Sequence, residues 1–231
     1  MLAAPTPVNE DQRLEALRAC QVLDSSPEQV YDDLTHLASF ICHTPISLIS
    51  LVDEDRQWFK SKVGIDAETS PREVSFCGHA ICDPGRILEI PDATQDPRFA
   101  DNPFVTEDPN IRFYAGSPLV DADGNALGTL CVIDKKPRKL SQDQLDALDA
   151  LGRQAVAWLE LRRTSHELQQ LLEDEGAGPA QGQAPAAEAT NGSPTAASAA
   201  GPQEISSTAR TKLEAIHARM ETLRDRLSAT R

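Results

Sequence analysis

The residues in this sequence best suited to chemistry are three close-set thiol and imidazole groups, Cys77, His79 and Cys82. Zinc is bound by cysteine and histidine at short spacings of this kind, so the C-x-H-x-x-C pattern first indicates a metal site. A structural zinc site needs four ligands, and the second ligand pair that normally completes one is missing. We therefore expect no metal, and we expect Cys77 to pack as a small apolar side chain.

A second group of polar residues alternates along 121–125, in the sequence Asp-Ala-Asp-Gly-Asn. Oxygen ligands at this spacing resemble the start of a calcium-binding loop. The glycine comes one position early, however, and Val132 stands where calcium requires a bidentate Glu. Asp-Gly also supplies the positive φ angles that a hairpin turn needs, so we interpret the segment as a turn between two strands.

Charge and cysteine content exclude several classes of protein. The 231 residues include 22 Lys and Arg against 36 Asp and Glu, a net charge of -14 that repels nucleic acids and anionic lipids. The five cysteines are odd in number and irregularly spaced, unlike a secreted disulfide framework. Neither a signal peptide nor an apolar run long enough to span a bilayer is found. We expect a cytoplasmic protein that binds neither nucleic acid nor membrane.

Helical periodicity marks where the core that positions these groups begins and ends. The apolar residues of 27–43 recur at helical spacing, with Ser26 as an expected N-cap and a proline at the first helical position. An earlier helix starting at Asn9 is expected to pack beside it. Ser141 and Gln144 can form a capping box, which opens a third and longer helix.

Between these helices the apolar period falls to two, as in β-strands. The pattern predicts five strands, at 45–52, 57–63, 87–90, 113–120 and 126–133. The first is apolar on both faces, as expected of an inner strand. Residues 91–111 are rich in Asp, Pro and Asn, which predicts a long ordered loop with a helical turn. Such loops in compact domains are often functional.

The C-terminal quarter has a different composition. Residues 176–203 contain 10 Ala, 5 Gly and 4 Pro but no Leu, Ile, Val or Phe, so we predict a disordered linker. The apolar residues of 204–231 then recur in steps of three and four, as in a helix that pairs with another. A short helix is marginal in water unless something covers its apolar side. The same helix of another protomer, the earlier helices of its own chain and a different protein are the three alternatives.

The order of these elements, together with several sequence blocks, resembles a GAF domain. The likeness is greatest to the N-terminal sensory GAF modules of bacterial two-component sensor kinases and diguanylate cyclases. The blocks are 13–24, 46–60, 76–81, 90–93, 113–119 and 124–134. The resemblance implies an α+β, GAF/PAS-like fold in which helices flank an antiparallel β-sheet. It also implies a small-molecule pocket between the sheet and the segments that follow the first hairpin.

Other activities found among GAF domains are weaker matches. Some of these domains attach a bilin through a Cys followed directly by His, but the only such pair here, Cys42-His43, stands at the end of a predicted helix. Free methionine sulfoxide reductases are GAF enzymes with nucleophilic cysteines, and 111–119, where a reactive one would stand, contains none. GAF domains that bind cyclic nucleotides carry an Asn-Lys motif and an Asp-Glu pair, and we find no such series.

The segment Ser165-His166-Glu167-Leu168 resembles the phosphoacceptor box of histidine kinases. The match stops there, because Gln169-Gln170-Leu171 replaces the expected Arg-Thr-Pro. Only 65 residues follow His166, too few for an ATP-binding domain. We interpret His166 as a surface residue of a signalling helix.

We therefore predict five segments: a flexible N-terminus at 1–9, a GAF domain at 10–165, a signalling-helix extension at 166–175, a disordered linker at 176–203 and a short amphipathic coiled-coil-type helix at 204–231. The expected function is non-enzymatic sensing or regulation in intracellular signal transduction, through an unidentified small molecule and a paired helix. A homodimer through helices 141–175 and 204–231 is the expected assembly, with a signalling protein as a further partner. The alternatives are a GAF-based thiol redox enzyme or sensor and a histidine phosphoacceptor remnant of a sensor kinase.

Candidate pocket residues come from the family's pocket-lining segments and mix apolar with polar groups. They are Phe76, Cys77, His79, Phe99, Phe104, Phe113, Ala115 and Ser117.

Overall fold

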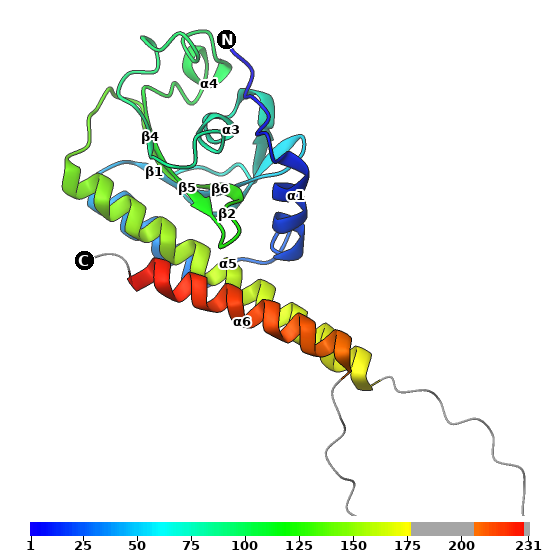
Figure 1. The fold of residues 1–231 in the computed structure, drawn as a ribbon. Helices are drawn as coiled ribbons and strands as arrows, with labels where there is room; N and C mark the ends of the chain where they lie inside the picture. Colours follow the sequence, from blue (N-terminus) through cyan, green and yellow to red (C-terminus); the bar gives the residue numbers. More distant parts are fainter. Residues whose placement is uncertain (177–205, 229–231) are drawn as a thin grey trace, which may run out of the picture.

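The structure, a computed structural model, describes residues 1–176 and 206–228 (Figure 1), and for 175 and 176 the backbone only. The predicted linker lies outside the described residues, except that Gly176 ends a helix. The elements in chain order are α1 (Glu10–Ala19), α2 (Gln29–Cys42), β1 (Ile46–Val52), β2 (Arg56–Val63), β3 (Thr69–Pro71), the 3-10 helix η1 (Arg72–Val74), α3 (Phe76–Ala80), β4 (Leu88–Ile90), α4 (Pro103–Thr106), β5 (Phe113–Val120), β6 (Ala126–Asp134), α5 (Gln142–Gly176) and α6 (Ser207–Ser228).

The six strands form one antiparallel sheet in the order β3-β2-β1-β6-β5-β4. The five predicted strands are all present, and the α+β fold of an antiparallel sheet flanked by helices is confirmed. Strands β1 and β6 lie at the centre and are buried along their whole length, which fits an inner strand that is apolar on both faces. The short strand β3 and the helix α3 were not predicted.

The two faces of the sheet are covered differently (Figure 1). On the face that we call the helical face, α1, α2 and α5 pack against the sheet through a core that includes Leu17, Tyr31, Ile49, Phe113, Val132 and Leu159. On the other face, which we call the cavity face, α3, α4 and the connecting loops surround a second core that includes Leu48, Phe76, Phe99, Tyr114 and Cys131. Because side chains alternate along a strand, each inner strand contributes to both cores.

The helix starts agree only in part with the sequence patterns. Ser141 and Gln144 form the expected capping box: the Ser141 N–H donates to Gln144 Oε1 at 3.0 Å, and the Gln144 N–H donates to Ser141 Oγ at 3.3 Å. The prediction that Ser26 caps α2 is wrong, because the helix begins at Gln29. The buried ammonium of Lys60 instead donates to the Ser26 carbonyl at 2.7 Å and to Glu28 at 2.6 Å, which holds this segment outside the helix.

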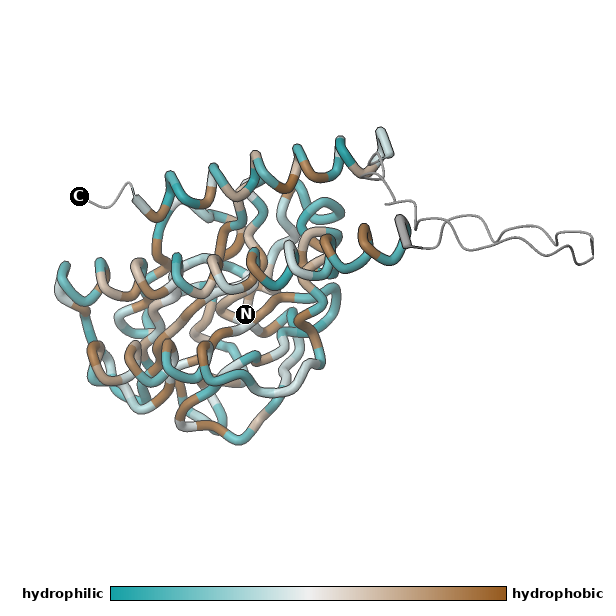
Figure 2. Tube along the Cα trace, turned by 90° about the horizontal axis from the view of Figure 1, so that it is seen from below, coloured by the Kyte–Doolittle hydropathy of each residue, from teal (hydrophilic) through white to brown (hydrophobic). Residues whose placement is uncertain are grey.

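The last helix, α6, lies beside α5 of its own chain in both views (Figures 1 and 2). Its apolar stripe is buried there through Ala209, Ile216 and Leu223. Arg219 of α6 forms ion pairs with two residues of α5, with Glu160 at 3.2 Å and also with Glu167. In the structure, the apolar side of α6 is therefore covered by a helix of its own chain, which was one of the three alternatives. Among the described helices, none combines the length and the apolar character needed to cross a membrane.

Candidate ligand-binding site

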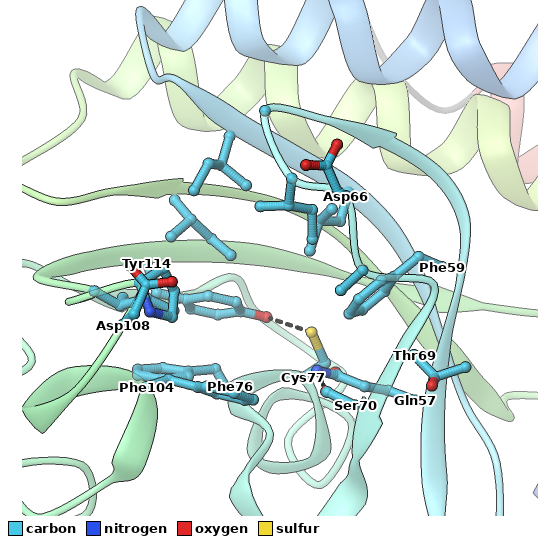
Figure 3. Close-up of a pocket in the computed structure, with 18 of the residues that line it drawn as sticks. Gln57, Phe59, Asp66, Thr69, Ser70, Phe76, Cys77, Phe104, Asp108 and Tyr114 are labelled. Carbon is cyan, nitrogen blue, oxygen red and sulfur yellow. Dashed lines mark hydrogen bonds between the residues drawn. The ribbon is translucent and has the colours of Figure 1, made fainter.

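A cavity of about 470 Å³ opens on the cavity face of the sheet (Figure 3). Its base is formed by β1, β2, β5 and β6, and its sides by α3, by the segment 64–70 after β2 and by the 104–111 segment. The apolar lining residues include Ile46, Leu48, Phe59, Ile65, Phe76, Phe104, Ile111, Tyr114 and Ile133. The segment 64–70 follows the first hairpin, where the family resemblance places a pocket.

Aromatic rings form one side of this cavity. Phe76 stacks on Phe99 with ring centroids 4.1 Å apart, and the ring of Tyr114 lies 5.2 Å from Phe76. The Tyr114 hydroxyl donates to Cys77 Sγ at 3.5 Å (Figure 3). This position of the ring requires glycine at 116, because a Cβ there would lie 2.1 Å from the Tyr114 hydroxyl oxygen.

The polar residues that line the cavity lie at one end of it and at its mouth. Gln57 is buried among the lining residues, accepts a hydrogen bond from Ser50 Oγ at 3.1 Å and donates to Ser70. Asp66, Asp108 and Lys135 are exposed at the mouth. The cavity thus combines an apolar body with a small set of convergent polar groups, as small-molecule sites do.

The thiol of Cys77 lines the cavity, and Cys131 lies with it in the core of the cavity face. Hydrogen bonding to Cys131 lowers the pKa of Cys77, and the hydroxyls of Thr129, Tyr114 and Ser50 act in the same direction against the effect of burial. The pKa of Cys131 is raised by the same hydrogen bond and by its burial. The pair therefore favours a thiolate on Cys77 and a proton on Cys131.

Three of the eight predicted pocket residues line the cavity: Phe76, Cys77 and Phe104. Phe99 stands behind Phe76 and supports it. His79 is half-buried outside the cavity, with its ring edge on Phe99 and Nε2 3.3 Å from the Leu2 carbonyl oxygen. Burial lowers the pKa of this histidine.

The placement of Phe113, Ala115 and Ser117 in the pocket is corrected by the structure. All three point to the helical face, where Phe113 and Ala115 join the core and Ser117 Oγ donates to Asp149 of α5 at 3.2 Å. Alternation along β5 is the reason, since the neighbouring Tyr114 faces the cavity. The family likeness located the right strand but not the right side of it.

Sequence reasoning missed Tyr114, Gln57 and the whole segment 64–70. The signal for Tyr114 was present, because α5 is long enough to need a continuous apolar partner surface. Phe113, Ala115 and Leu119 supply it, at positions two and four residues apart on β5. The alternate residues of β5 then have to face the other side. Gln57 and 64–70 carried no comparable signal.

The remaining motifs lie apart from the cavity. Cys82 Sγ donates to the carbonyl oxygens of Pro5 and Gly78, away from the Cys77 thiol, so the C-x-H-x-x-C residues do not converge. Over residues 1–176 and 206–228, no group of three or more His, Cys, Asp or Glu side chains could hold a metal. Cys42 and His43 stand at the end of α2, and His166 is half-buried on α5.

The 121–125 segment is a hairpin turn, as predicted. Asp121 Oδ1 accepts the backbone N–H groups of Asp123 at 3.0 Å and Asn125 at 2.7 Å, and Gly124 has a φ of 89°. The spacing of the acidic residues is therefore explained by the hydrogen bonds of the turn.

Three known proteins are similar to this chain in sequence or in fold. The sequence is 40% identical over 167 residues to a cyclic di-GMP phosphodiesterase of Pseudomonas aeruginosa, and the match covers 72% of this chain but only 28% of that relative. The chromophore-binding domain of a bacteriophytochrome from R. palustris has a similar fold, with a TM-score of 0.50, 12% identity and coverage of 70% of this chain and 65% of that one. The GAF domain of an Acinetobacter phosphoenolpyruvate-protein phosphotransferase gives a TM-score of 0.48 at 19% identity, covering 69% and 96%.

The sequence model of the GAF domain matches residues 26–157, a stretch that runs from just before α2 to the middle of α5 and includes all six strands. It contains every residue that lines the cavity. By sequence and by fold, this chain belongs to the GAF domain family.

Proposed function

We propose that this GAF domain is a sensory module that binds a small, mostly apolar molecule and regulates a signalling output through α5. The observation that carries the proposal is the cavity of about 470 Å³, with apolar residues on its base and polar groups at one end. Its volume lies in the range of small-molecule sites. Such a molecule would bury its apolar part against Leu48, Phe76 and Ile133 and direct a polar group toward Gln57.

The charge of the lining narrows the ligand class. Lys135 is the single basic residue among those that line the cavity, and Asp66 and Asp108 share the mouth with it. A molecule with several phosphates would meet two carboxylates and one ammonium, an unfavourable balance. We therefore infer a neutral or weakly polar ligand, and we do not expect cyclic nucleotides to bind here.

The strands provide a short route from the cavity to α5. Tyr114 and Ile133 face the cavity, whereas Phe113 and Val132, their chain neighbours, pack in the core beneath α5. Ser117 of β5 also hydrogen-bonds Asp149 of α5. A ligand that favours one position of β5 and β6 would thereby favour one position of α5.

An exposed apolar stripe on α5 offers an output surface. Trp158, Leu161, Leu168 and Leu172 remain 38–74% exposed, on a side of the helix that neither α6 nor the sheet covers. With the exposed Ser165 between Leu161 and Leu168, they recur in steps of three and four. Such spacing is typical of a helix that pairs with another helix. We propose that two copies of the chain dimerise through this stripe, and that α6 instead stays on its own α5.

The relative in Pseudomonas aeruginosa supports cyclic di-GMP metabolism as the signalling context. The match covers 72% of this chain but only about 28% of that relative's length. We propose that the module controls an enzyme of this kind and does not itself cleave the dinucleotide.

Ligand binding can be tested by native mass spectrometry of the full chain and by thermal unfolding with a library of small apolar metabolites. A ligand at a hundredfold excess over its Kd should stabilise the fold by about 2.7 kcal/mol. Ile65→Trp, which places a large ring into the cavity, should abolish the shift. Leu161→Trp on α5 is the matched control and should retain it. A stabilisation that survives Ile65→Trp, or none with any metabolite, would contradict the proposal.

Dimerisation can be measured separately by sedimentation velocity. Leu161→Glu and Leu168→Glu should each convert dimer to monomer, because they place a charge in the apolar stripe. Leu213→Glu, at a similarly exposed leucine of α6, should not. A wild-type chain that stays monomeric at high concentration would refute the dimer without affecting the ligand proposal.

A further inference from the structure

Two buried thiols meet beside the cavity, and the sensory role proposed above does not use them. Cys77 at the start of α3 and Cys131 in the middle of β6 are both buried, at 3% and 0% exposure, in the core of the cavity face. The Tyr114 hydroxyl, which donates to Cys77 Sγ at 3.5 Å, lies over Gly116, and Gly116 is the cross-strand partner of Cys131, so both cysteines stand beside this hydroxyl. Cys77 also lines the cavity, so a small molecule that enters can reach one member of the pair.

The groups around the pair are hydroxyl donors. The Tyr114 hydroxyl lies 3.5 Å from Cys77 Sγ and 3.5 Å from Thr129 Oγ1. Thr129 and Cys131 are two residues apart on β6 and therefore point to the same face. These hydroxyls can stabilise a thiolate on Cys77, and a thiolate is the reactive form of cysteine.

The other three cysteines differ from this pair. Burial raises the pKa of Cys20 to about 12 and that of Cys42 to about 11, which keeps both protonated. Cys82 is half-exposed, and its thiol donates to backbone carbonyl oxygens. Of the five thiols, Cys77 is the one that combines access from the cavity, hydroxyl donors and a neighbouring thiol.

We propose that Cys77 and Cys131 form a redox-active pair that is oxidised by small hydroperoxides entering the cavity. The Cys77 thiolate attacks the outer peroxide oxygen, the O–O bond breaks, and Cys77 becomes a sulfenic acid. The other peroxide oxygen leaves as an alkoxide or, from hydrogen peroxide, as hydroxide, and takes a proton from water to become an alcohol or water. The Cys131 thiol then attacks the Cys77 sulfur. The S–S bond forms, the sulfenic oxygen leaves as water with the Cys131 proton, and the peroxide has accepted two electrons.

The disulfide would link α3 to the central strand at the wall of the cavity. Tyr114, which donates to Cys77 in the reduced state, would lose that thiolate partner. Oxidation would therefore change the shape and polarity of the same cavity that the sensory proposal assigns to a ligand. The redox inference requires only that the cavity admits a peroxide, so a failed ligand screen leaves it standing.

The test uses hydrogen peroxide on the folded full chain, followed by trypsin digestion without reducing agent. Cleavage after Arg72, Arg86, Arg112 and Lys135 releases peptide 73–86, with Cys77 and Cys82, and peptide 113–135, with Cys131. We expect a species that joins these two peptides and is two hydrogens lighter than their sum. The Cys82→Ser variant should give the same cross-link, which assigns it to Cys77.

Further experiments measure how readily Cys77 is oxidised in the wild type and in two variants. In Cys131→Ser, Cys77 has no resolving thiol and should accumulate as a sulfenic acid that dimedone traps. In the wild type, Cys77 should be oxidised at least about tenfold faster than Cys20 or Cys42, whose thiols stay protonated. Tyr114→Phe should slow the oxidation severalfold, because the Cys77 thiolate loses one donor.

The cross-link in wild-type protein is the deciding result, since it needs no variant to fold. The inference is overturned if peroxide oxidises Cys82 while Cys77 and Cys131 keep their thiols. It is also overturned if the cross-link forms only after unfolding in urea.

Discussion

The helical face of the sheet is covered by the long helices α1, α2 and α5, whereas the cavity face is covered by the four- and five-residue helices α4 and α3 and by loops. Both faces are formed by the same strands, and both have an apolar core. A long amphipathic helix presents a continuous apolar stripe that fills the space over a sheet. Short segments with many turns cannot, and the space that they leave is the cavity. The same sheet thus has one face that carries stability and one that can admit a ligand.

The largest predicted effect tests whether the helical face carries most of the stability. Phe113→Ala removes a fully buried ring beneath α5 and should lower the free energy of unfolding by about 3–5 kcal/mol. Phe104→Ala on the cavity wall, where the ring is only partly buried, should cost about 1 kcal/mol. Urea unfolding at constant m-value measures both. Equal losses would remove the distinction between the faces.

A second prediction concerns how tightly the cavity wall is packed. Gly116→Ala places a Cβ against the fully buried Tyr114 ring and should destabilise the fold by about 1–3 kcal/mol, since the ring has to move. Tyr114→Phe removes the nearest clashing atom, so the double variant should recover part of this loss in a double-mutant cycle. Strictly additive losses would show that the ring does not occupy this position.

The third prediction tests whether α6 extends the helical layer. Arg219→Ala leaves Glu160, at 2% exposure, without its ion-pair partner across the α5–α6 interface. Docking of α6 should weaken by about 1.4 kcal/mol, or tenfold in the undocked fraction. Limited proteolysis within α6 reports that fraction. Arg224→Ala, at an exposed arginine that pairs within α6, is the matched control and should leave the cleavage rate unchanged.

The smallest effect is a pH dependence at the contact that joins the two faces. Glu10 of α1 accepts from Arg13 and also pairs with Arg72 of η1. Partial burial opposes ionisation, but the two arginines outweigh it and lower the pKa of Glu10 to about 2 from 4.5.

Because the folded pKa is the lower one, this contribution is complete above pH 4.5 and is lost as the pH falls toward 2. For a partly exposed carboxylate we expect about 1 kcal/mol. In urea titrations at several pH values, the free energy of unfolding of Glu10→Gln should therefore fall by about 1 kcal/mol less than that of the wild type between pH 4.5 and pH 2. The other carboxylates are the same in both proteins and contribute equally to both curves. Parallel curves for the two proteins would show that Glu10 does not couple the faces.

Much of the fold was predictable because its signals are local. The capping box at Ser141, the turn at 121–125 and the alternation of the inner strands each depend on residues close in sequence. The start of α2 was wrong because Lys60, which is over thirty residues away, draws the segment before Gln29 into its own hydrogen bonds. Helix α3 was missed because its five residues are too few for a periodic pattern.

The amino-acid sequence by itself determined the long helices and five of the six strands, the resemblance to a GAF domain, and the need of the final helix for a covering surface. Only the tertiary structure decided that Gln57 and the segment 64–70 line the cavity, that Cys77 and Cys131 lie in one core, and that α6 lies on its own α5. The physical reason is the range of the interactions. Periodicity, caps and turns act over a few residues, whereas a cavity wall or a thiol pair depends on which distant side chains are brought together when the strands align.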